Sequence, residues 1–327
     1  MIIDTHAHFT PQSMLQALKR KISQFPSVEL LVDDDTYKLG FAGGKLTRPI
    51  SRKLREVDQR LDWMRDQCID AQINGGWLDS FGYELPAEEG AAWSRFLNEF
   101  LMSGTERHKA LIPLATVPLQ NGKLSAKVLE EALKAGFTGV MIGTQPHGNS
   151  GNLDDPNLDP FWEAASSLKA TLYLHPMFGC GDPRLLDYGM TNAIGRGIDT
   201  SIAISRLLFS GHLLKYSGMT FVLSHGGGAL PYLLGRLARN VELLGHEYAD
   251  PVLGFKTLYF DTVLFDPEAL NFLKNLVGAE KIMLGSDYPF PIGDPYPLKI
   301  IQNAGLSETE TNLILGDTAA KKFKVKF

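Results

Sequence analysis

The chain of 327 residues contains 44 % hydrophobic and 21 % charged residues, the balance of an ordinary globular protein. Its net charge of −5 argues against nucleic-acid binding, because nucleic-acid-binding surfaces are basic. Two cysteines, Cys68 and Cys180, make no disulfide framework, and no apolar run reaches the roughly 20 residues that a membrane span needs. The N-terminus shows no signal-peptide pattern, so we expect a cytoplasmic protein that binds neither nucleic acid nor membrane.

Short apolar runs recur along the chain without alternation, as is typical of buried parallel strands. Eight strands are predicted, at 2–8, 69–77, 111–117, 137–142, 171–175, 220–225, 258–262 and 282–287. Helical patterns lie between them, at 54–64, 128–133, 160–169, 231–244 and 267–277, and Ser307 with Glu310 predicts a capping box before a last helix. This alternation predicts an α/β fold, a (β/α)₈ TIM barrel that forms a single domain over residues 1–327.

One interval between predicted strands is too long for a simple β/α unit. About sixty residues separate His8 from Ile69, whereas such a unit needs roughly thirty. A β-prone run at 28–32, an acidic turn at 33–35 and a second β-prone run predict a small antiparallel insertion after strand 1, within about residues 12–50. Long loops at 147–160 and 176–199 are expected on the same face, where barrel active sites lie.

Four histidines and one aspartate stand at the carboxyl ends of predicted strands. His6 and His8 end strand 1, and their spacing places both side chains on one side of the strand. His175 ends strand 5, His225 ends strand 6 and Asp287 ends strand 8. Because these strand ends converge on one rim of a barrel, we expect the five side chains to be neighbours.

Imidazoles with one carboxylate are suitable ligands for a divalent metal of intermediate softness. Such an ion makes bound water more acidic, and a nearby histidine is suited to moving protons near neutral pH. The sequence therefore predicts a metal centre with an acid/base residue beside it. The remaining histidines, His108, His147, His212 and His246, are not assigned to chemistry, although His147 stands in a loop after strand 4.

A series of motifs in this order resembles the metal-dependent amidohydrolase superfamily, and in particular the branch that contains aminocarboxymuconate-semialdehyde decarboxylase. The motifs are Asp4–His8, Phe81-Gly82-Tyr83, His175-Pro176, His225–Gly228 with Leu234-Gly235-Arg236, and Leu284–Phe290. The resemblance implies one divalent ion, Zn²⁺ in the first place and Mn²⁺ as the alternative, bound by His6, His8, His175 and Asp287. It gives His225 the acid/base role. Strand 4 ends without the lysine that bridges two metals in dinuclear members, in agreement with a single ion.

The resemblance also implies substrate-binding residues and a homodimer. Arg48 and Arg236 would hold substrate carboxylate, for which guanidinium is well shaped. Arg236 lies eleven residues after His225 on a predicted helix, and similar enzymes donate this arginine to the neighbouring subunit's site. Tyr188 stands near the place of a substrate-stacking tryptophan in the decarboxylase. Trp77 and Phe290 are expected at the rim of the same pocket.

Three functions remain open from the sequence. The first is non-oxidative decarboxylation of a small unsaturated or aromatic carboxylic acid. The second is hydrolysis of a lactone or amide, or hydration of a double bond, with the same metal. The third is a metal-binding barrel without activity. An esterase is not supported, because no Gly-x-Ser-x-Gly motif accompanies the glycines after His225, and no nucleotide-binding glycine motif is present.

Overall fold

The computed structural model describes residues 1–148, 150–177, 179–244 and 247–325, and it contains all eight predicted strands as parallel strands. Each starts within three residues of its predicted start, and all but the third and the sixth have all of their residues buried. Their bounds are β1 (Ile3–Phe9), β4 (Ala71–Gly76), β5 (Leu111–Pro113), β6 (Val140–Gly143), β7 (Thr171–His175), β8 (Thr220–Leu223), β9 (Leu258–Asp261) and β10 (Ile282–Met283).

The two exceptions to full burial are β5 and β8, whereas β1 is buried along its whole length. Partial exposure is confined to Ile112 and Pro113 of β5 and to Thr220 of β8. Near-continuous apolar runs in the sequence predict strands that are buried on both faces. Such burial is typical of parallel strands in a sheet that helices cover.

The eight strands close into a ring in chain order. Hydrogen-bonded ladders join β1, β4 and β5 in one sheet and β6 to β10 in another. Two parallel bridges connect the sheets, between Ala115 and Val140 at one seam and between Ala7 and Tyr288 at the other. Because each seam links neighbours in the strand order, the predicted (β/α)₈ barrel is confirmed.

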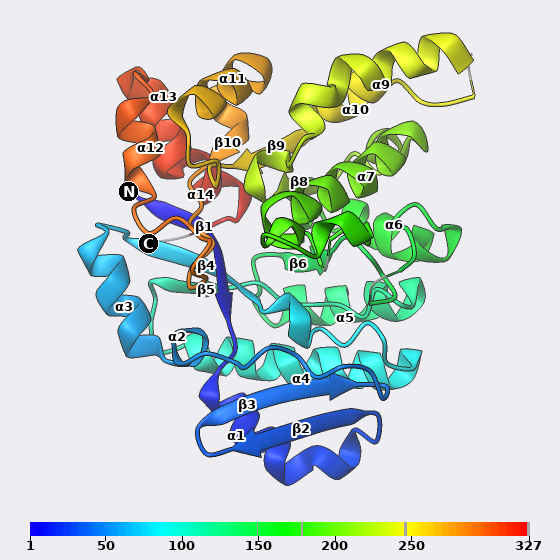
Figure 1. Ribbon diagram of the computed structural model, residues 1–327, viewed down its shortest axis with the longest axis vertical. Helices are drawn as coiled ribbons and strands as arrows, with labels where there is room; N and C mark the ends of the chain where they lie inside the picture. The colour runs from blue at the N-terminus through cyan, green and yellow to red at the C-terminus, as the bar shows by residue number, and fades with distance from the viewer. Residues whose placement is uncertain (149, 178, 245–246, 326–327) are drawn as a thin grey trace.

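Helices lie between the strands and around the barrel (Figure 1). The predicted capping box is present, since Ser307 and Glu310 bond each other's backbone N–H. The helices are α1 (Gln12–Lys21), α2 (Arg52–Arg55), α3 (Val57–Asp66), α4 (Ala87–Thr105), α5 (Gly122–Lys134), α6 (Asp159–Ser167), α7 (Arg196–Phe209), α8 (His212–Lys215), α9 (Leu230–Leu244), α10 (Pro251–Phe255), α11 (Pro267–Val277), α12 (Leu298–Asn303), α13 (Glu308–Asn312) and α14 (Thr318–Lys322). No helix in the described ranges is both long and apolar enough to cross a membrane.

The predicted insertion after β1 is an antiparallel hairpin of β2 (Val28–Asp33) and β3 (Thr36–Phe41). It lies at one end of the molecule beside α1 (Figure 1). Phe41 packs against Trp93 of α4, with ring centroids 5.7 Å apart. The chain then returns to the barrel through Arg48 and the buried Ile50, so the hairpin brings Arg48 to the carboxyl-terminal rim.

Candidate metal centre

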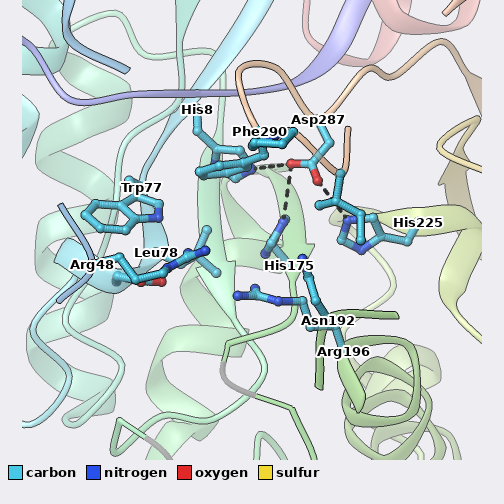
Figure 2. A pocket seen from close by; sticks show the side chains of 13 residues that line it. His8, Arg48, Trp77, Leu78, His175, Asn192, Arg196, His225, Asp287 and Phe290 are labelled. Carbon is cyan, nitrogen blue, oxygen red and sulfur yellow. Dashed lines mark hydrogen bonds and ion pairs between the residues drawn. The ribbon is translucent and has the colours of Figure 1, made fainter. Parts of the chain in front are cut away.

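The five residues predicted at strand ends meet at the carboxyl-terminal rim of the barrel. His6 and His8 lie on β1, and His175 is the last residue of β7. His225 follows β8 by two residues, and Asp287 follows β10 by four. Figure 2 shows His8, His175 and His225 arranged around the carboxylate of Asp287. The barrel therefore brings together five residues that are spread over nearly the whole length of the sequence.

Asp287 Oδ1 is the point at which the imidazoles of this cluster converge. It lies 3.1 Å from His8 Nε2, 3.3 Å from His6 Nε2 and 4.0 Å from His175 Nε2. The second oxygen, Oδ2, lies 3.5 Å from His225 Nε2. The Nε2 atoms of His6 and His8 are 3.3 Å apart. Such close approach of several nitrogen atoms and one carboxylate is typical of ligands around a cation.

The opposite nitrogen of each of three imidazoles is already bonded to the protein. His6 Nδ1 lies 2.6 Å from Asp261 Oδ2, His175 Nδ1 2.8 Å from the carbonyl of Pro176, and His8 Nδ1 3.2 Å from the carbonyl of Gly76. An imidazole that donates from Nδ1 keeps a lone pair on Nε2, which is the arrangement found in metal-binding histidines. His175 Nε2 is buried without a hydrogen-bond partner among the described residues, so it fits a metal ligand.

One subset of the cluster meets the geometry of a metal site. The ligand atoms of His6, His175, His225 and Asp287 all lie within 4.8 Å of one another. His8 lies outside that group but is the histidine nearest to Asp287 Oδ1. We favour His8 over His225 as a ligand because His8 is fully buried and bonded at Nδ1, whereas the His225 side chain is 21 % exposed and its Nδ1 has no partner within the described part of the chain. The donor set of imidazoles and one carboxylate fits a divalent ion.

Burial and the two carboxylates determine the charge of the histidines in the metal-free protein. Burial opposes protonation of His6, but the charges of Asp287 and Asp261 and their hydrogen bonds raise its pKa to about 10. Burial lowers the pKa of His8, and it lowers the pKa of His175 well below its usual value. His8 and His175 are therefore neutral at pH 7, the form that coordinates a metal, and a metal held at the cluster would displace the proton of His6.

Asp261 is a positioning residue that the sequence reasoning did not identify. Besides His6, its carboxylate accepts hydrogen bonds from the Tyr173 hydroxyl at 3.0 Å and from the Gly226 N–H at 2.9 Å. It therefore joins the His6 ring to the segment that carries His225. The sequence contained a signal for it, because Asp261 is the next-to-last residue of the strand predicted at 258–262 and so stands near the strand end, as the proposed ligands do.

Asp4 is a second positioning residue, and it holds the Asp287 segment against β1. Its buried carboxylate accepts hydrogen bonds from the Ser286 hydroxyl at 2.6 Å, the Gln72 amide at 2.7 Å and the Ser286 N–H at 3.0 Å. Burial raises the pKa of Asp4 to about 6, although the hydrogen bonds from Ser286 and Gln72 lower it in part. The residue before Asp287 is thus fixed to the strand that carries His6 and His8.

The backbone at His225 and Asp287 adopts a conformation that most residues avoid. Their φ angles are +53° and +59°, in the left-handed region. Gly226 has φ +59°, and a Cβ there would lie 2.3 Å from Leu264 Cδ2, so another residue would strain the backbone and displace the Leu264 side chain. The glycines after His225 therefore allow the sharp turn that directs its imidazole toward Asp287. Left-handed backbone at non-glycine residues is concentrated at functional sites.

A family model described as amidohydrolase matches residues 3–325, nearly the whole chain. The chain belongs to the amidohydrolase family. The 2-amino-3-carboxymuconate-6-semialdehyde decarboxylase of Dictyostelium discoideum is 29 % identical over 325 residues, which cover 97 % of this chain and 90 % of that protein. The resemblance to this branch, predicted from the motifs, is confirmed.

Solved structures of similar fold support the barrel assignment of this amidohydrolase. The 5-carboxyvanillate decarboxylase of Sphingomonas paucimobilis superposes with a TM-score of 0.82 at 24 % identity, covering 99 % of both chains. The 5-carboxyvanillate decarboxylase of Novosphingobium aromaticivorans, solved with bound manganese, gives a TM-score of 0.80 at 20 % identity, covering 99 % of this chain and 97 % of that one. Both comparisons show the fold.

A cavity of about 230 Å³ opens beside the cluster of histidines around Asp287 in this amidohydrolase. Arg48, Trp77 and Phe290, which the sequence analysis placed at the substrate, line it together with His8, His175, His225 and Asp287. The Arg48 guanidinium carbon lies 5.6 Å from the centre of the Trp77 ring and 5.9 Å from that of Phe290. Aromatic and cationic groups thus form one wall of the cavity (Figure 2).

The other two predicted substrate residues lie outside this cavity within the single chain. Tyr188 is 96 % exposed, and Arg236 is exposed on α9. His147 also lies elsewhere, beside a separate polar cavity, and His246 lies outside the described residues. Three further polar or charged lining residues were missed, namely Asp79, Asn192 and Arg196. Asn192 and Arg196 stand in the loop expected at 176–199, whereas Asp79 shortly follows the strand predicted at 69–77.

Proposed function

We propose that this amidohydrolase is a metal-dependent non-oxidative decarboxylase of an unsaturated or aromatic carboxylic acid. The observation that carries the proposal is the position of His225, whose imidazole faces both the Asp287 carboxylate and the cavity. A proton donor placed there can act on a substrate carbon held next to the cluster. The decarboxylase names of the relatives support the same reaction class.

His6, His8, His175 and Asp287 are the proposed ligands of one divalent ion. When bound, the ion supplies positive charge that stabilises negative charge developing on the substrate. The imidazole-rich donor set favours Zn²⁺. Mn²⁺ is the alternative, supported by the manganese in a structure of similar fold. Elemental analysis of protein purified without added metal, followed by activity after reconstitution with each ion, decides between them.

His225 is proposed to transfer a proton to the carbon that carries the departing carboxylate. The carbon gains the proton, and cleavage of the carbon–carbon bond then returns its electron pair to the substrate and releases CO₂. His225 regains its proton from solvent, since its side chain is partly exposed. Trp77 and Phe290 would flank the planar substrate, and Arg48 would bind a substrate carboxylate at the cavity wall.

Arg236 and Tyr188 enter this proposal through a homodimer. Both are exposed in the single chain, and Tyr232, four residues before Arg236 on the same helix, is 83 % exposed. An exposed aromatic residue beside an exposed arginine is typical of an interface surface. We propose that α9 packs on a second copy and donates Arg236 to the neighbouring cavity. The two cysteines, both free, suit a cytoplasmic location.

CO₂ release tests the proposed reaction. Metal-loaded protein is incubated with a panel of muconate semialdehydes and hydroxybenzoates, and with lactones and amides of similar size. We expect stoichiometric CO₂ from one or more acids and no turnover of the lactones and amides. Turnover of a lactone or an amide without CO₂ would favour the hydrolase alternative instead.

A further inference from the structure

Of the two arginines in the cavity, Arg48 already has a carboxylate partner. Its Nε and Nη2 atoms donate to Asp79 Oδ2 at 3.3 and 3.2 Å. The Asp79 side chain is only 9 % exposed, whereas that of Arg48 is 56 % exposed. The positive charge of Arg48 is therefore balanced within the cavity wall, and water covers much of its side chain.

Arg196 is the second arginine, and most of its donors have no partner. It is the first residue of α7, directly after the π-helical turn Thr191–Gly195. Its Nη1 donates to the carbonyl of Pro176 at the long distance of 3.4 Å, and its buried Nε has no hydrogen-bond partner among the described residues. A guanidinium has five N–H donors, so several remain free for a ligand.

The free donors of Arg196 face the reaction site. Figure 2 shows its guanidinium beneath the His175 ring, extending across the cavity toward Arg48. Among the described residues, Arg196 forms no ion pair within 4.0 Å. Asp79 already pairs with Arg48, and Asp287 faces the imidazoles, so neither of these lining carboxylates forms an ion pair with Arg196. A largely buried cation without a counter-ion is costly unless a ligand supplies the negative charge.

We propose that Arg196 is a substrate-carboxylate anchor supplied by the same subunit, and that the cavity therefore prefers substrates with two acidic groups. One acidic group would lie at the metal cluster and the second would accept hydrogen bonds from Arg196. This inference rests on the proposed function, because it concerns the substrate of that site. It also assigns an anion-binding role within the chain that does not require the partner's Arg236.

Binding of two non-reacting probes separates this role from catalysis. Benzoate carries one carboxylate, and benzene-1,3-dicarboxylate carries a second at the distance of a ring. Isothermal titration of each probe into metal-loaded protein gives the two dissociation constants. We expect wild type to bind the dicarboxylate at least about 10-fold more tightly than benzoate, because a hydrogen bond to a charged group contributes that much or more.

Substitution of Arg196 should remove this preference selectively. In Arg196→Met, binding of the dicarboxylate should weaken by about 10- to 100-fold, while binding of benzoate changes by less than about 2-fold. Arg196→Gln, which keeps donors without the charge, should give an intermediate loss. Arg184→Met is the matched control, since Arg184 lies in the same loop region, is 87 % exposed and pairs with Asp182. It should bind both probes as wild type does.

Other outcomes overturn the inference. It fails if both Arg196 variants keep the preference for the dicarboxylate, if they lose affinity for both probes equally, or if wild type shows no preference or no binding. Metal content and melting temperature are measured for each variant so that a folding defect is recognised. The proposed function is judged separately by CO₂ release. If the protein prefers the dicarboxylate through Arg196 but decarboxylates no acid, the anion site is supported. The proposed decarboxylase function is then wrong.

Discussion

Asp287 Oδ1 lies within 4.0 Å of three imidazole nitrogens, and no single residue of the cluster is more central. Each of these imidazoles is bonded at its other nitrogen to a different part of the barrel. The orientation of the rings is therefore set by the fold before a metal binds. A preorganised site of this kind loses little conformational freedom when it takes up an ion.

The proposed division between ligands and acid/base residue predicts opposite behaviour for two alanine variants. His6→Ala removes a buried ligand and should lose most of its bound metal. His225→Ala should keep its metal and lose at least about 100-fold in turnover, because general acid catalysis contributes that much. Metal is measured by elemental analysis of the purified proteins. Equal metal content in wild type and His6→Ala would contradict the ligand assignment.

Substitution of Asp261 should weaken metal binding less than loss of a ligand does, because Asp261 acts only through His6. Asp261→Asn keeps the shape of the side chain but removes the charge that holds His6 Nδ1 at 2.6 Å. We expect metal affinity to fall about 10- to 100-fold, since residues that support a ligand contribute that much. Competition with a chelator of known affinity measures the change. Asp266→Asn is a control on an exposed helix cap, and unchanged affinity in Asp261→Asn would contradict the positioning role.

At the residue level, the sequence was sufficient for the strand-end side chains but not for the groups around them. His6, His175 and Asp287 could be placed because the end of a barrel strand has one known position on the rim. Arg196 could not be placed, because its direction depends on the π-helical turn before α7, which leaves no periodic pattern. The same rule about strand ends could also have identified Asp261.

At the level of elements, the strands were predicted more accurately than their ends. β8 was expected to reach His225 but stops at Leu223, and β10 was expected to reach Asp287 but stops at Met283. In both, the backbone leaves the ladder and turns through a left-handed residue, at His225 or Asp287. Apolar composition indicates where a strand runs, whereas such turns depend on contacts between distant segments.

The position of α9 predicts complementation between two inactive variants. Arg236→Ala and His225→Ala are expected to be inactive alone. In a mixed dimer, the Arg236→Ala subunit keeps His225 and receives Arg236 from its partner, so one site is restored. Random exchange should give up to about a quarter of wild-type activity. No recovery despite subunit exchange verified by mass spectrometry would contradict donation of Arg236 between subunits.

At the level of the whole molecule, the proposed metal ligands come from both sheets of the barrel. His6 and His8 belong to β1, His175 to β7, and Asp287 follows β10, so the cluster lies across the seam where Ala7 meets Tyr288. A metal bound there would add a further connection between β1 and the segment after β10, which backbone hydrogen bonds from Thr5 to Leu284 and from His8 to Tyr288 already join. We propose that the cluster contributes to closure of the barrel as well as to the reaction.

Metal removal should therefore lower stability. A ligand at about 1,000 times its dissociation constant stabilises the folded state by about 4 kcal/mol, provided that it does not bind the unfolded chain. We expect dialysis against a chelator to lower the melting temperature by several degrees and re-addition of metal to restore it. The His6→Ala variant is the control, because a chelator should not change its melting temperature. An equal shift in wild type and His6→Ala would contradict this link.

The central claim, decarboxylation with protonation by His225, is tested most directly by isotopes from solvent. An acid that releases CO₂ is converted in D₂O and separately in water enriched in oxygen-18, and the product is examined by mass spectrometry and NMR. We expect one deuterium at the carbon that lost the carboxylate, no oxygen-18 in the product, and at least about 100-fold less product and CO₂ from His225→Ala. Oxygen-18 in a product formed without CO₂ would show hydrolysis or hydration and would contradict the account.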